Sequence, residues 1–454
     1  MTASEPRHEI DRLLLEADVV LTMDRDRRVV SPGRILVEGG RIVAVGEAAV
    51  LPEGGERLSI PGGLVVPGLV QSHVHLGQTI FRGLAEGRRL LAWLRERIWP
   101  LEAAHDDDSA YWSTRLGAAE CLLGGTTTVQ EIGLGPGAAG LLEALVDSGL
   151  RAVAGMCLMD SGAELPDGLR GDTDRVLERT LGLGERYDGA DGGRLRYSLN
   201  PRFILTGSDE LWRRLRELAE ERGWPLHTHA LEQRDESEAV RALKGGRDEI
   251  EYFDSHGVLD TQLCLAHGVW LTERHLERLG GRRLSVAHCP SANLKLGSGI
   301  ADIIAIRRAG LPVGVGADGA ACNNDLDCLE EVRLAALLQA LEHGPEAIDG
   351  ATALGLATEE GARALGMGDE IGSLEAGKAA DLVVLDGSRP ELAAAASADP
   401  HDLVAFSATR AAVRHVMVGG RWQVWDGELL HSDLAEIVRR LSEHRTRLLE
   451  RARL

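Results

Sequence analysis

Lysine is scarce in this sequence. Among 454 residues only Lys244, Lys295 and Lys378 occur, and arginine supplies the rest of the positive charge. The 50 lysines and arginines face 71 aspartates and glutamates, which gives a formal net charge of -21. General affinity for nucleic acid or for an anionic membrane needs a basic face, and no dense cluster of basic residues is present. We therefore expect neither nucleic acid nor a membrane as a partner.

Long apolar runs are absent as well. No stretch of about 18 apolar residues could span a bilayer, and residues 1–12 are polar and charged, unlike a signal peptide. These absences favour a cytoplasmic location. The cysteines form no CxxC pair, so we expect free buried thiols rather than disulfides or zinc ligands. They are Cys121, Cys157, Cys264, Cys289, Cys322 and Cys328.

Short strands with tight turns lie at both ends of the chain. Residues 34–45 and residues 416–425 each consist of two apolar runs around a Gly-Gly pair, which is the pattern of a β-hairpin. A further strand is expected over 381–385. Because isolated hairpins are only marginally stable in water, we expect both ends to join in one small β-sandwich domain.

Between the ends, strand-like apolar runs alternate with helical patterns over about 300 residues, which suits a (β/α)8 barrel of TIM type in the α/β class. The first barrel strand is expected over Gly63–Val70. A doubly wound sheet is the alternative, but no GxGxxG follows an early strand. The expected domains are a sandwich from 1–66 and 371–430, a barrel over 67–370 and a helix within 431–454.

A histidine or an aspartate follows several of the predicted barrel strands. Residues two apart in a strand face the same way, so His73 and His75 project into one space. The other polar side chains at strand ends are His227, His229, His267, His288 and Asp318. Active sites of such barrels lie at the carboxyl ends of the strands, and imidazole with carboxylate suits zinc or iron(II). The pattern therefore predicts a metal centre.

Six short segments of the sequence contain these residues or lie near the C-terminal strands. They are PGLVQSHVH (67–75), HTHALE (227–232), LAHGVW (265–270), HCPSANLKL (288–296), GADGA (316–320) and GSLEAGKAADL (372–382). With them the sequence resembles, over nearly its whole length, the amidohydrolase superfamily and its deaminase and chlorohydrolase group. That group includes deaminases of 5'-deoxyadenosine, methylthioadenosine and S-adenosylhomocysteine, guanine deaminases and s-triazine hydrolases.

The resemblance implies a role for each of the main residues. The implied ligands of a divalent ion, zinc or alternatively iron(II), are His73, His75, His229 and Asp318. The implied catalytic residues are Glu232, His267 and Asp318, which act on substrate and water. We expect His227 to support the site without binding the metal.

The lysine count bears on the number of metal ions. Some members of the superfamily hold two ions bridged by a carboxylated lysine from a mid-barrel strand. No lysine precedes Lys244, which lies beyond the strand of His229, and the other two lie further along the chain. A bridging lysine is therefore absent, and we expect a mononuclear site.

Hydrolysis follows from this set of residues. A divalent ion lowers the pKa of a bound water toward neutrality. Asp318 and His267 can take its proton, and Glu232 can protonate the ring nitrogen beside the carbon that carries the amino group. The same residues would serve to expel chloride from a chlorotriazine.

The resemblance also implies substrate contacts for Gln78, Trp93, Glu102, Met156, Arg202 and His288. Glu102 would accept bonds from ribose hydroxyls, whereas Gln78 and Arg202 match the base contacts of guanine deaminases. Met156 stands where an arginine would bind the carboxylate of an amino-acid tail. Because residues 316–327 are most similar to adenosine-type deaminases, our leading hypothesis is deamination of a 5'-modified adenosine with a small 5' group.

Several alternatives stay open. A guanine or 8-oxoguanine deaminase and an s-triazine amino- or chlorohydrolase are the runners-up. A catalytically inactive binding protein is disfavoured by the intact ligand set together with Glu232. An iron oxygenase would need only three ligands, and the additional acid-base pair favours hydrolysis. We also expect a homo-oligomer, either a dimer or a tetramer.

Overall fold

The computed structural model describes residues 11–47, 49–50, 55–393 and 398–453. The expectation that no signal peptide is present rests mainly on residues 1–10, which lie outside the described residues. Contacts divide the chain into two compact units. The first unit comprises residues within Met1–Gln71, Ala119–Thr128 and Asp327–Ser432, and the second comprises Ser72–Ala118, Val129–Leu326 and residues within Asp433–Leu454.

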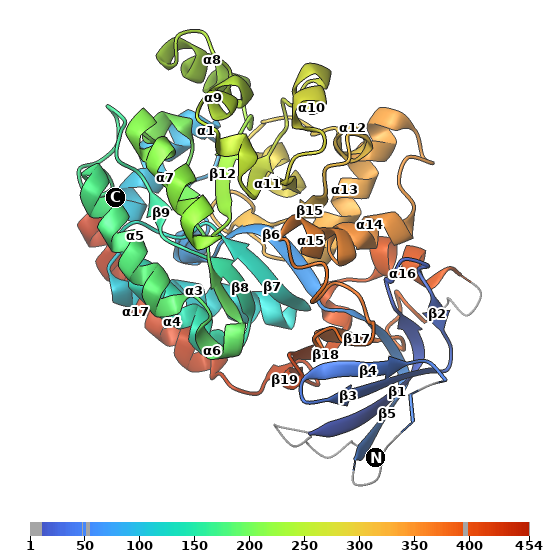
Figure 1. The fold of residues 1–454 in the computed structure, drawn as a ribbon. Coiled ribbons are helices and arrows are strands. Elements are labelled where there is room, and N and C mark those ends of the chain that lie inside the picture. The colour runs from blue at the N-terminus through green and yellow to red at the C-terminus, as the bar shows by residue number, and fades with distance from the viewer. Residues whose placement is uncertain (1–10, 48, 51–54, 394–397, 454) are drawn as a thin grey trace. The chain divides into compact units, whose positions relative to one another are not determined.

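The first unit contains one sheet built from both ends of the chain. Its strand order is β20-β19-β18-β17-β5-β1-β3-β4, and β2 pairs with β1 (Figure 1). The strands are β1 (Arg12–Leu21), β2 (Val29–Val30), β3 (Gly33–Glu38), β4 (Arg41–Val45), β5 (Glu56–Pro67), β17 (Leu382–Asp386), β18 (Val413–Val418), β19 (Arg421–Trp425) and β20 (Glu428–Leu429). This pairing joins the two ends in one sheet; the sandwich arrangement stays a prediction.

Both predicted hairpins are present in this sheet. β3 pairs antiparallel with β4, and β18 with β19. The turn of the first has φ of 54° at Gly39 and 77° at Gly40, and the second has 56° at Gly419 and 80° at Gly420. Two successive positive φ values match the twist of a hairpin and favour glycine, which explains both Gly-Gly pairs.

The prediction of a single strand over Gly63–Val70 was wrong. β5 ends at Pro67, and the next strand, β6, runs from Leu69 to His75. A Cβ at Gly68 would lie 2.1 Å from Oγ1 of Thr127, so the backbone can pass this point only without a side chain. The chain therefore leaves the terminal sheet at Gly68, and His73 and His75 are the last inward residues of a separate strand.

The second unit contains most of the expected barrel strands, while β6 and β7 begin in the first unit. One sheet has the order β10-β8-β7-β6-β16, another β12-β13-β14-β15, and β11 pairs with β9. The bounds are β6 (Leu69–His75), β7 (Thr126–Glu131), β8 (Arg151–Ala154), β9 (Cys157–Leu158), β10 (Leu195–Tyr197), β11 (Asn200–Pro201), β12 (Leu226–Ala230), β13 (Leu263–His267), β14 (Leu284–His288), β15 (Val313–Val315) and β16 (Asp318–Gly319).

These strands do not pair into one closed ring among the described residues. A single parallel bridge between Leu199 and Leu226 lies at one break. At the other, β15 pairs with β14, whereas β16 pairs with β6 through Asp318 and Val74. A Cβ at Gly316 would lie 2.3 Å from the carbonyl oxygen of His73. Glycine there lets the chain approach β6 and delivers Asp318 to the side of the histidines.

Helices of the second unit follow its strands, and α4 and α5 contact β8 and β10 respectively (Figure 1). The α-helices are α1 (Leu90–Trp93), α2 (Trp99–Ala103), α3 (Asp107–Leu123), α4 (Ala138–Ser148), α5 (Thr173–Tyr187), α6 (Ala190–Gly193), α7 (Asp209–Arg222), α8 (Arg234–Leu243), α9 (Glu249–Ser255), α10 (Glu273–Leu279), α11 (Pro290–Lys295), α12 (Ile303–Arg308), α13 (Cys328–His343), α14 (Gly350–Leu356), α15 (Glu359–Ala364), α16 (Pro400–Ser407) and α17 (Leu434–Ala452). Short helical turns are η1 (Leu76–Phe81), η2 (Leu94–Ile98), η3 (Ile204–Thr206), η4 (Val258–Asp260) and η5 (Arg410–Ala412).

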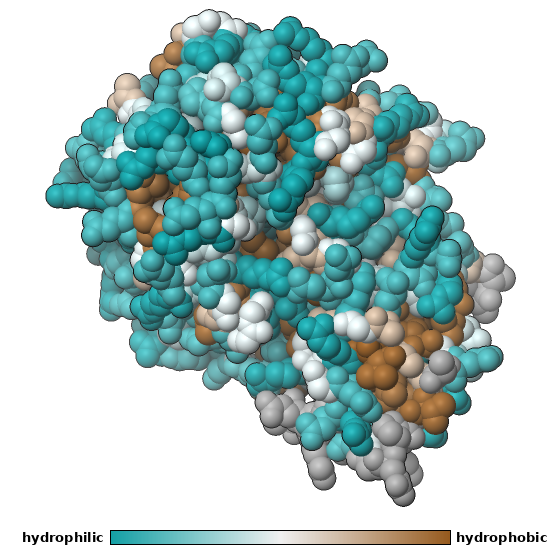
Figure 2. All heavy atoms as spheres, viewed as in Figure 1, coloured by the Kyte–Doolittle hydropathy of each residue, from teal (hydrophilic) through white to brown (hydrophobic). Residues whose placement is uncertain are grey.

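A C-terminal helix was expected within 431–454, and α17 (Leu434–Ala452) lies in that range. Its apolar residues Leu441 and Leu448 join the core of the second unit, which also contains Phe81 and Trp93. All six cysteines are buried and free, as predicted. No helix among the described residues is long and apolar enough to cross a membrane. Polar side chains cover most of the face shown in Figure 2.

Candidate metal and catalytic site

Four buried side chains from three strands of the second unit meet in one place. His73 and His75 come from β6, His229 from β12 and Asp318 from β16. We call this group the histidine centre. Parallel strands bring their carboxyl ends to one edge, and alternate residues of β6 face the same side. The structure thus brings together the four residues that were predicted as ligands.

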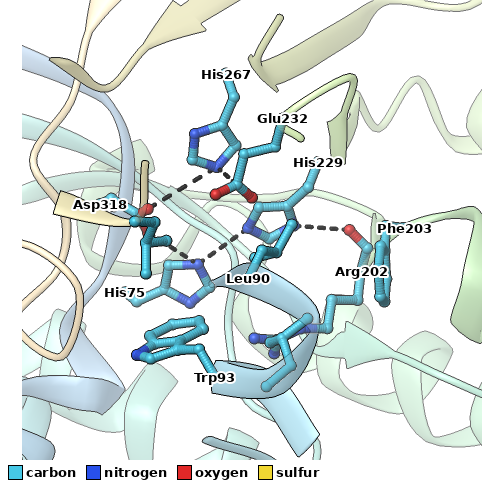
Figure 3. A pocket seen from close by; sticks show the side chains of 11 residues that line it. His75, Leu90, Trp93, Arg202, Phe203, His229, Glu232, His267 and Asp318 are labelled. Atoms are coloured by element: carbon cyan, nitrogen blue, oxygen red, sulfur yellow. Dashed lines mark hydrogen bonds and ion pairs between the residues drawn. The ribbon is translucent and has the colours of Figure 1, made fainter. Parts of the chain in front are cut away.

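The spacing of the donor atoms fits one small cation. Nε2 of His75 lies 3.1 Å from Nε2 of His229 and 3.3 Å from Oδ1 of Asp318 (Figure 3). Oδ1 of Asp318 also lies 3.4 Å from Nε2 of His73. Zinc takes four ligands at about 2.0–2.2 Å in a tetrahedron, whose edges are then about 3.3–3.6 Å. These three distances therefore suit donors that share one divalent ion.

Hydrogen bonds behind the centre set the histidine tautomers. Nδ1 of His229 donates to the carbonyl oxygen of Arg202 at 2.7 Å, which leaves the lone pair on Nε2 for a ligand. Nδ1 of His73 lies 2.9 Å from Nε2 of His227, while Nε2 of His73 is buried without a hydrogen-bond partner. An unpartnered buried nitrogen is costly, and a cation bound there removes that cost. His227 thus contacts His73, and its supporting role stays a prediction.

Burial controls the charges of the centre. It lowers the pKa of His73, His75 and His229, so the imidazoles are neutral near pH 7. Burial by itself raises the pKa of Asp318, but the nearby His73 ring, 3.4 Å away, and the other imidazoles outweigh it and hold the pKa below the usual range. Neutral imidazoles beside one carboxylate are the protonation states that a metal ligand set requires.

No lysine contributes to the histidine centre. Nζ of Lys244 pairs with Asp209 at 2.7 Å, and Nζ of Lys295 pairs with Glu86 at 2.8 Å. Nζ of Lys378 donates to the carbonyl oxygen of Gly368 at 2.6 Å. A bridging carboxylated lysine is therefore not available to hold a second ion.

Glu232 and His267 lie beside the centre. Nε2 of His267 is 3.5 Å from Oε2 of Glu232 and 3.8 Å from Oδ2 of Asp318, and it has no hydrogen-bond partner. Burial raises the pKa of Glu232, which makes this carboxyl a better proton donor near neutral pH.

The backbone around these residues is strained. Leu231, His267 and Asp318 have φ values of 55°, 74° and 59°, a region that residues other than glycine rarely occupy. Such strain persists where the surroundings overdetermine the geometry, and it is common at active sites.

A pocket of about 340 Å³ opens on the centre (Figure 3). Its polar floor consists of His75, His229, Glu232, His267 and Asp318. Its wall is apolar apart from Arg202 and consists of Leu90, Trp93, Leu94, Phe203 and Leu296. With a polar floor and a mainly apolar wall, the pocket suits a molecule that places a polar group at the centre and packs an apolar part against the wall.

The predicted substrate residues are distributed unevenly. Trp93 and Arg202 line the pocket. Glu102 and Gln78 lie next to Arg202: Nη1 of Arg202 donates to the two Glu102 oxygens at 2.9 and 2.8 Å, and Nε2 of Gln78 donates to Oε1 of Glu102 at 2.9 Å. Three predicted residues thus form one buried hydrogen-bonded group.

Met156 and His288 are elsewhere. Met156 lines a different cavity, together with Met159 and Arg175. His288 is fully buried, both of its ring nitrogens lack a partner, and burial lowers its pKa to about 3. Neither residue lines the pocket at the centre.

Sequence reasoning missed other residues of the site. The wall leucines Leu90, Leu94 and Leu296 carry no sequence signal beyond being apolar. Asn293 and Ser298, which contact His267 and Glu232, were not singled out. Asn293 lies within the segment 288–296, where only the fold reveals its partner.

Breaking the buried pair between Arg202 and Glu102 is expected to destabilise the protein. Both side chains are almost fully buried, so Arg202→Met leaves an uncompensated carboxylate, at a cost of about 3–5 kcal/mol. The free energy of unfolding in urea measures this loss. The control is Arg170→Met, which breaks an exposed pair with Asp167 and should cost less than about 1 kcal/mol. Equal losses in both variants would contradict the prediction.

Comparison with known proteins agrees with this geometry. The model of the amidohydrolase family matches residues 64–423. A 5-methylthioadenosine/S-adenosylhomocysteine deaminase from Pelotomaculum thermopropionicum is 34% identical over 97% of this chain and 99% of its own length. A 5'-deoxyadenosine deaminase from Methanopyrus kandleri is 35% identical over 84% of this chain and 85% of its own.

Solved structures extend the likeness to three dimensions. An adenosine deaminase from Xanthomonas campestris with bound zinc has a TM-score of 0.88 at 33% identity and covers 98% of this chain and 100% of its own. The fold is therefore the (β/α)8 barrel of α/β class that these enzymes share. Because the family model covers residues 64–423 and relatives match nearly the whole chain at about one third identity, the chain belongs to the amidohydrolase family and is a hydrolase that acts on carbon–nitrogen bonds of cyclic amidines.

Proposed function

We propose that the protein removes the amino group from the purine of a 5'-modified adenosine by hydrolysis and releases ammonia. The observation that carries this proposal is the histidine centre with Glu232 and His267 beside it on the floor of one small pocket. The relatives named as deaminases of methylthioadenosine, S-adenosylhomocysteine and 5'-deoxyadenosine support the substrate class.

The metal of the proposal is a single zinc ion, with iron(II) as the alternative. His73, His75, His229 and Asp318 would hold it, and their spacing and neutral imidazoles suit that ion. Bound zinc in the Xanthomonas campestris structure supports the choice, and the occupied lysines support one ion. When bound, such an ion lowers the pKa of a coordinated water toward neutrality.

The residues then divide the proton transfers between them. His267 and Asp318 accept the proton that the attacking water loses, because Nε2 of His267 and Oδ2 of Asp318 face the same point. Glu232 gives a proton to the ring nitrogen as the water oxygen bonds to the adjacent carbon. The accepted proton passes to the amino group, and the hydroxyl on the ring carbon returns its proton to Glu232 as the carbon–nitrogen bond breaks and ammonia leaves. One water is consumed, and the ring carbon keeps its oxygen as a carbonyl.

The pocket wall favours a small, uncharged 5' group. Leu90, Leu94, Phe203 and Leu296 offer no partner for a charge, and the charge of Arg202 is already neutralised by Glu102. A carboxylate with two oxygens has about four acceptor positions, and Glu102 uses three of them. Glu102 is 1% exposed and does not line the pocket, so its bond to a ribose hydroxyl stays a prediction from the sequence.

A substrate panel tests this proposal. We expect kcat/KM for 5'-deoxyadenosine and methylthioadenosine to exceed that for S-adenosylhomocysteine by about 10–100-fold, because burying its charged tail without partners costs about 1–3 kcal/mol. The measurement is ammonia release over a concentration series of each compound. Ammonia from guanine or 8-oxoguanine alone, or chloride from a chlorotriazine alone, would replace the proposal with one of the runners-up.

Other expectations from the sequence stay predictions. Apolar clusters occupy both faces of the terminal sheet, around Leu13 and Leu15 on one side and Leu14 and Leu36 on the other, which supports the proposed sandwich. The domain bounds at 66, 370 and 430, the dimer or tetramer and the cytoplasmic location are predictions of the same standing. So are the substrate contacts of Met156 and His288.

A further inference from the structure

One short segment contacts both proton carriers of the site. It runs from Cys289 to Ser298 after β14 and contains helix α11. Oδ1 of Asn293 lies 2.9 Å from Nδ1 of His267, and Oγ of Ser298 lies 3.3 Å from Oε1 of Glu232. Asn293 is 1% exposed and Ser298 is 3% exposed, so water does not compete for either contact.

The contact of Asn293 decides how His267 presents its ring. An amide oxygen only accepts, so Nδ1 of His267 carries the proton and donates it to Oδ1. Nε2 then keeps its lone pair, and it is the nitrogen that faces Glu232 and Asp318. The bond also fixes the rotation of the ring. A base that must take a proton from water needs this tautomer and this orientation.

The contact of Ser298 decides where its hydroxyl proton goes. Nε2 of Gln233 lies 3.2 Å from Oγ of Ser298 and is a donor, so that contact occupies a lone pair of the hydroxyl. The hydroxyl proton is then free for Oε1 of Glu232. The backbone of Ser298 is itself held, because Nε1 of Trp270 donates to its carbonyl oxygen at 3.1 Å.

Few other hydrogen bonds orient the side chains of Glu232 and His267. Glu232 follows Leu231, which has a φ of 55°, and His267 itself has a φ of 74°. A strained backbone of this kind needs surrounding contacts to hold it. Nε2 of His267 has no hydrogen-bond partner among the described residues, so Nδ1 is the only atom of this ring that a hydrogen bond holds.

We propose that Asn293 and Ser298 are positioning residues, which hold His267 and Glu232 in the orientation for proton transfer. The two carriers come from different strands, β13 and the end of β12, and a single segment aligns them with each other. This inference rests on the proposed function, because it assigns a task to residues that the deamination mechanism requires.

Kinetics of four variants test the inference. For Asn293→Ala and Ser298→Ala we expect kcat for 5'-deoxyadenosine to fall about 10–100-fold, the usual loss when a supporting hydrogen bond to an active-site group is removed. KM should change by no more than roughly two-fold, since neither residue lines the pocket. Asn293→Asp keeps an acceptor oxygen, and Ser298→Thr keeps the hydroxyl, so each should recover most of the lost kcat.

The control is Leu294→Ala, because Leu294 lies in the same helix with 44% exposure and contacts neither carrier. Its kcat should stay near that of the wild type, and all five variants should retain wild-type metal content and melting temperature. Unchanged kcat in both alanine variants, or losses that the conservative variants do not recover, would overturn the inference. If the wild type releases no ammonia from any adenosine derivative, the proposed function fails instead.

Discussion

Replacing Glu232 with glutamine is expected to abolish most turnover while leaving the metal in place. The amide has nearly the shape of the carboxyl but cannot donate a proton to the ring nitrogen and take it back. General acid-base catalysis contributes about 10²–10⁴-fold, so we expect kcat for ammonia release to fall within that range. Steady-state kinetics and metal analysis of the same preparation give both numbers.

The position of Glu232 explains why metal and turnover should separate. Its carboxyl contacts His267 at 3.5 Å and Ser298 at 3.3 Å and is not among the atoms of the histidine centre. A control is Glu236→Gln, since Glu236 is also buried but accepts backbone N–H groups of residues 232 and 233 instead of facing the pocket. Near-normal turnover in Glu232→Gln would show that the proton role assigned to it is wrong.

Replacing His73 with alanine is expected to remove both metal and activity. Nε2 of His73 lies 3.4 Å from Oδ1 of Asp318 and has no hydrogen-bond partner among the described residues. We therefore expect it to bind the metal, and the alanine variant lacks this ligand. Removing one of four ligands leaves three, and we expect the bound metal to fall well below one ion per chain. Turnover should fall below detection, a larger loss than in Glu232→Gln.

The neighbouring His227 provides the matched control. Nε2 of His227 lies 2.9 Å from Nδ1 of His73. His227 thus contacts a proposed ligand without being one itself. Loss of such a supporting partner costs about 10–100-fold in metal affinity or activity, so His227→Ala should still bind the ion at saturating concentration. If His227→Ala lost the metal and His73→Ala kept it, the two roles would have to be exchanged.

The position of the histidine centre could be predicted from the sequence because the pattern that indicates it is local. His73 and His75 are two residues apart on a strand, and the same spacing recurs at His227 and His229, so periodicity alone aims pairs of imidazoles at a strand end. Buried strands alternating with helices indicate a parallel arrangement. These two patterns suffice to expect histidines and Asp318 at one edge.

The rest depends on contacts that no local pattern encodes. The break at Gly68 follows from a close approach of Thr127, and the separate strand β16 follows from the backbone contact between Gly316 and His73. The pairing of Arg202 with Glu102 joins residues 100 positions apart. Asn293 and Ser298 are ordinary polar residues until the fold places them beside His267 and Glu232.

Titration of the metal-free protein with zinc, with ammonia release from 5'-deoxyadenosine as the readout, tests the central claim most directly. In the histidine centre the Asp318 carboxylate lies within 3.4 Å of Nε2 of His73 and of His75, Nε2 of His75 lies 3.1 Å from Nε2 of His229, and no bridging lysine is present. We therefore expect activity to rise in proportion to added zinc and to level off at one ion per chain. A plateau at two ions per chain, or full ammonia release from the metal-free protein, would contradict the account.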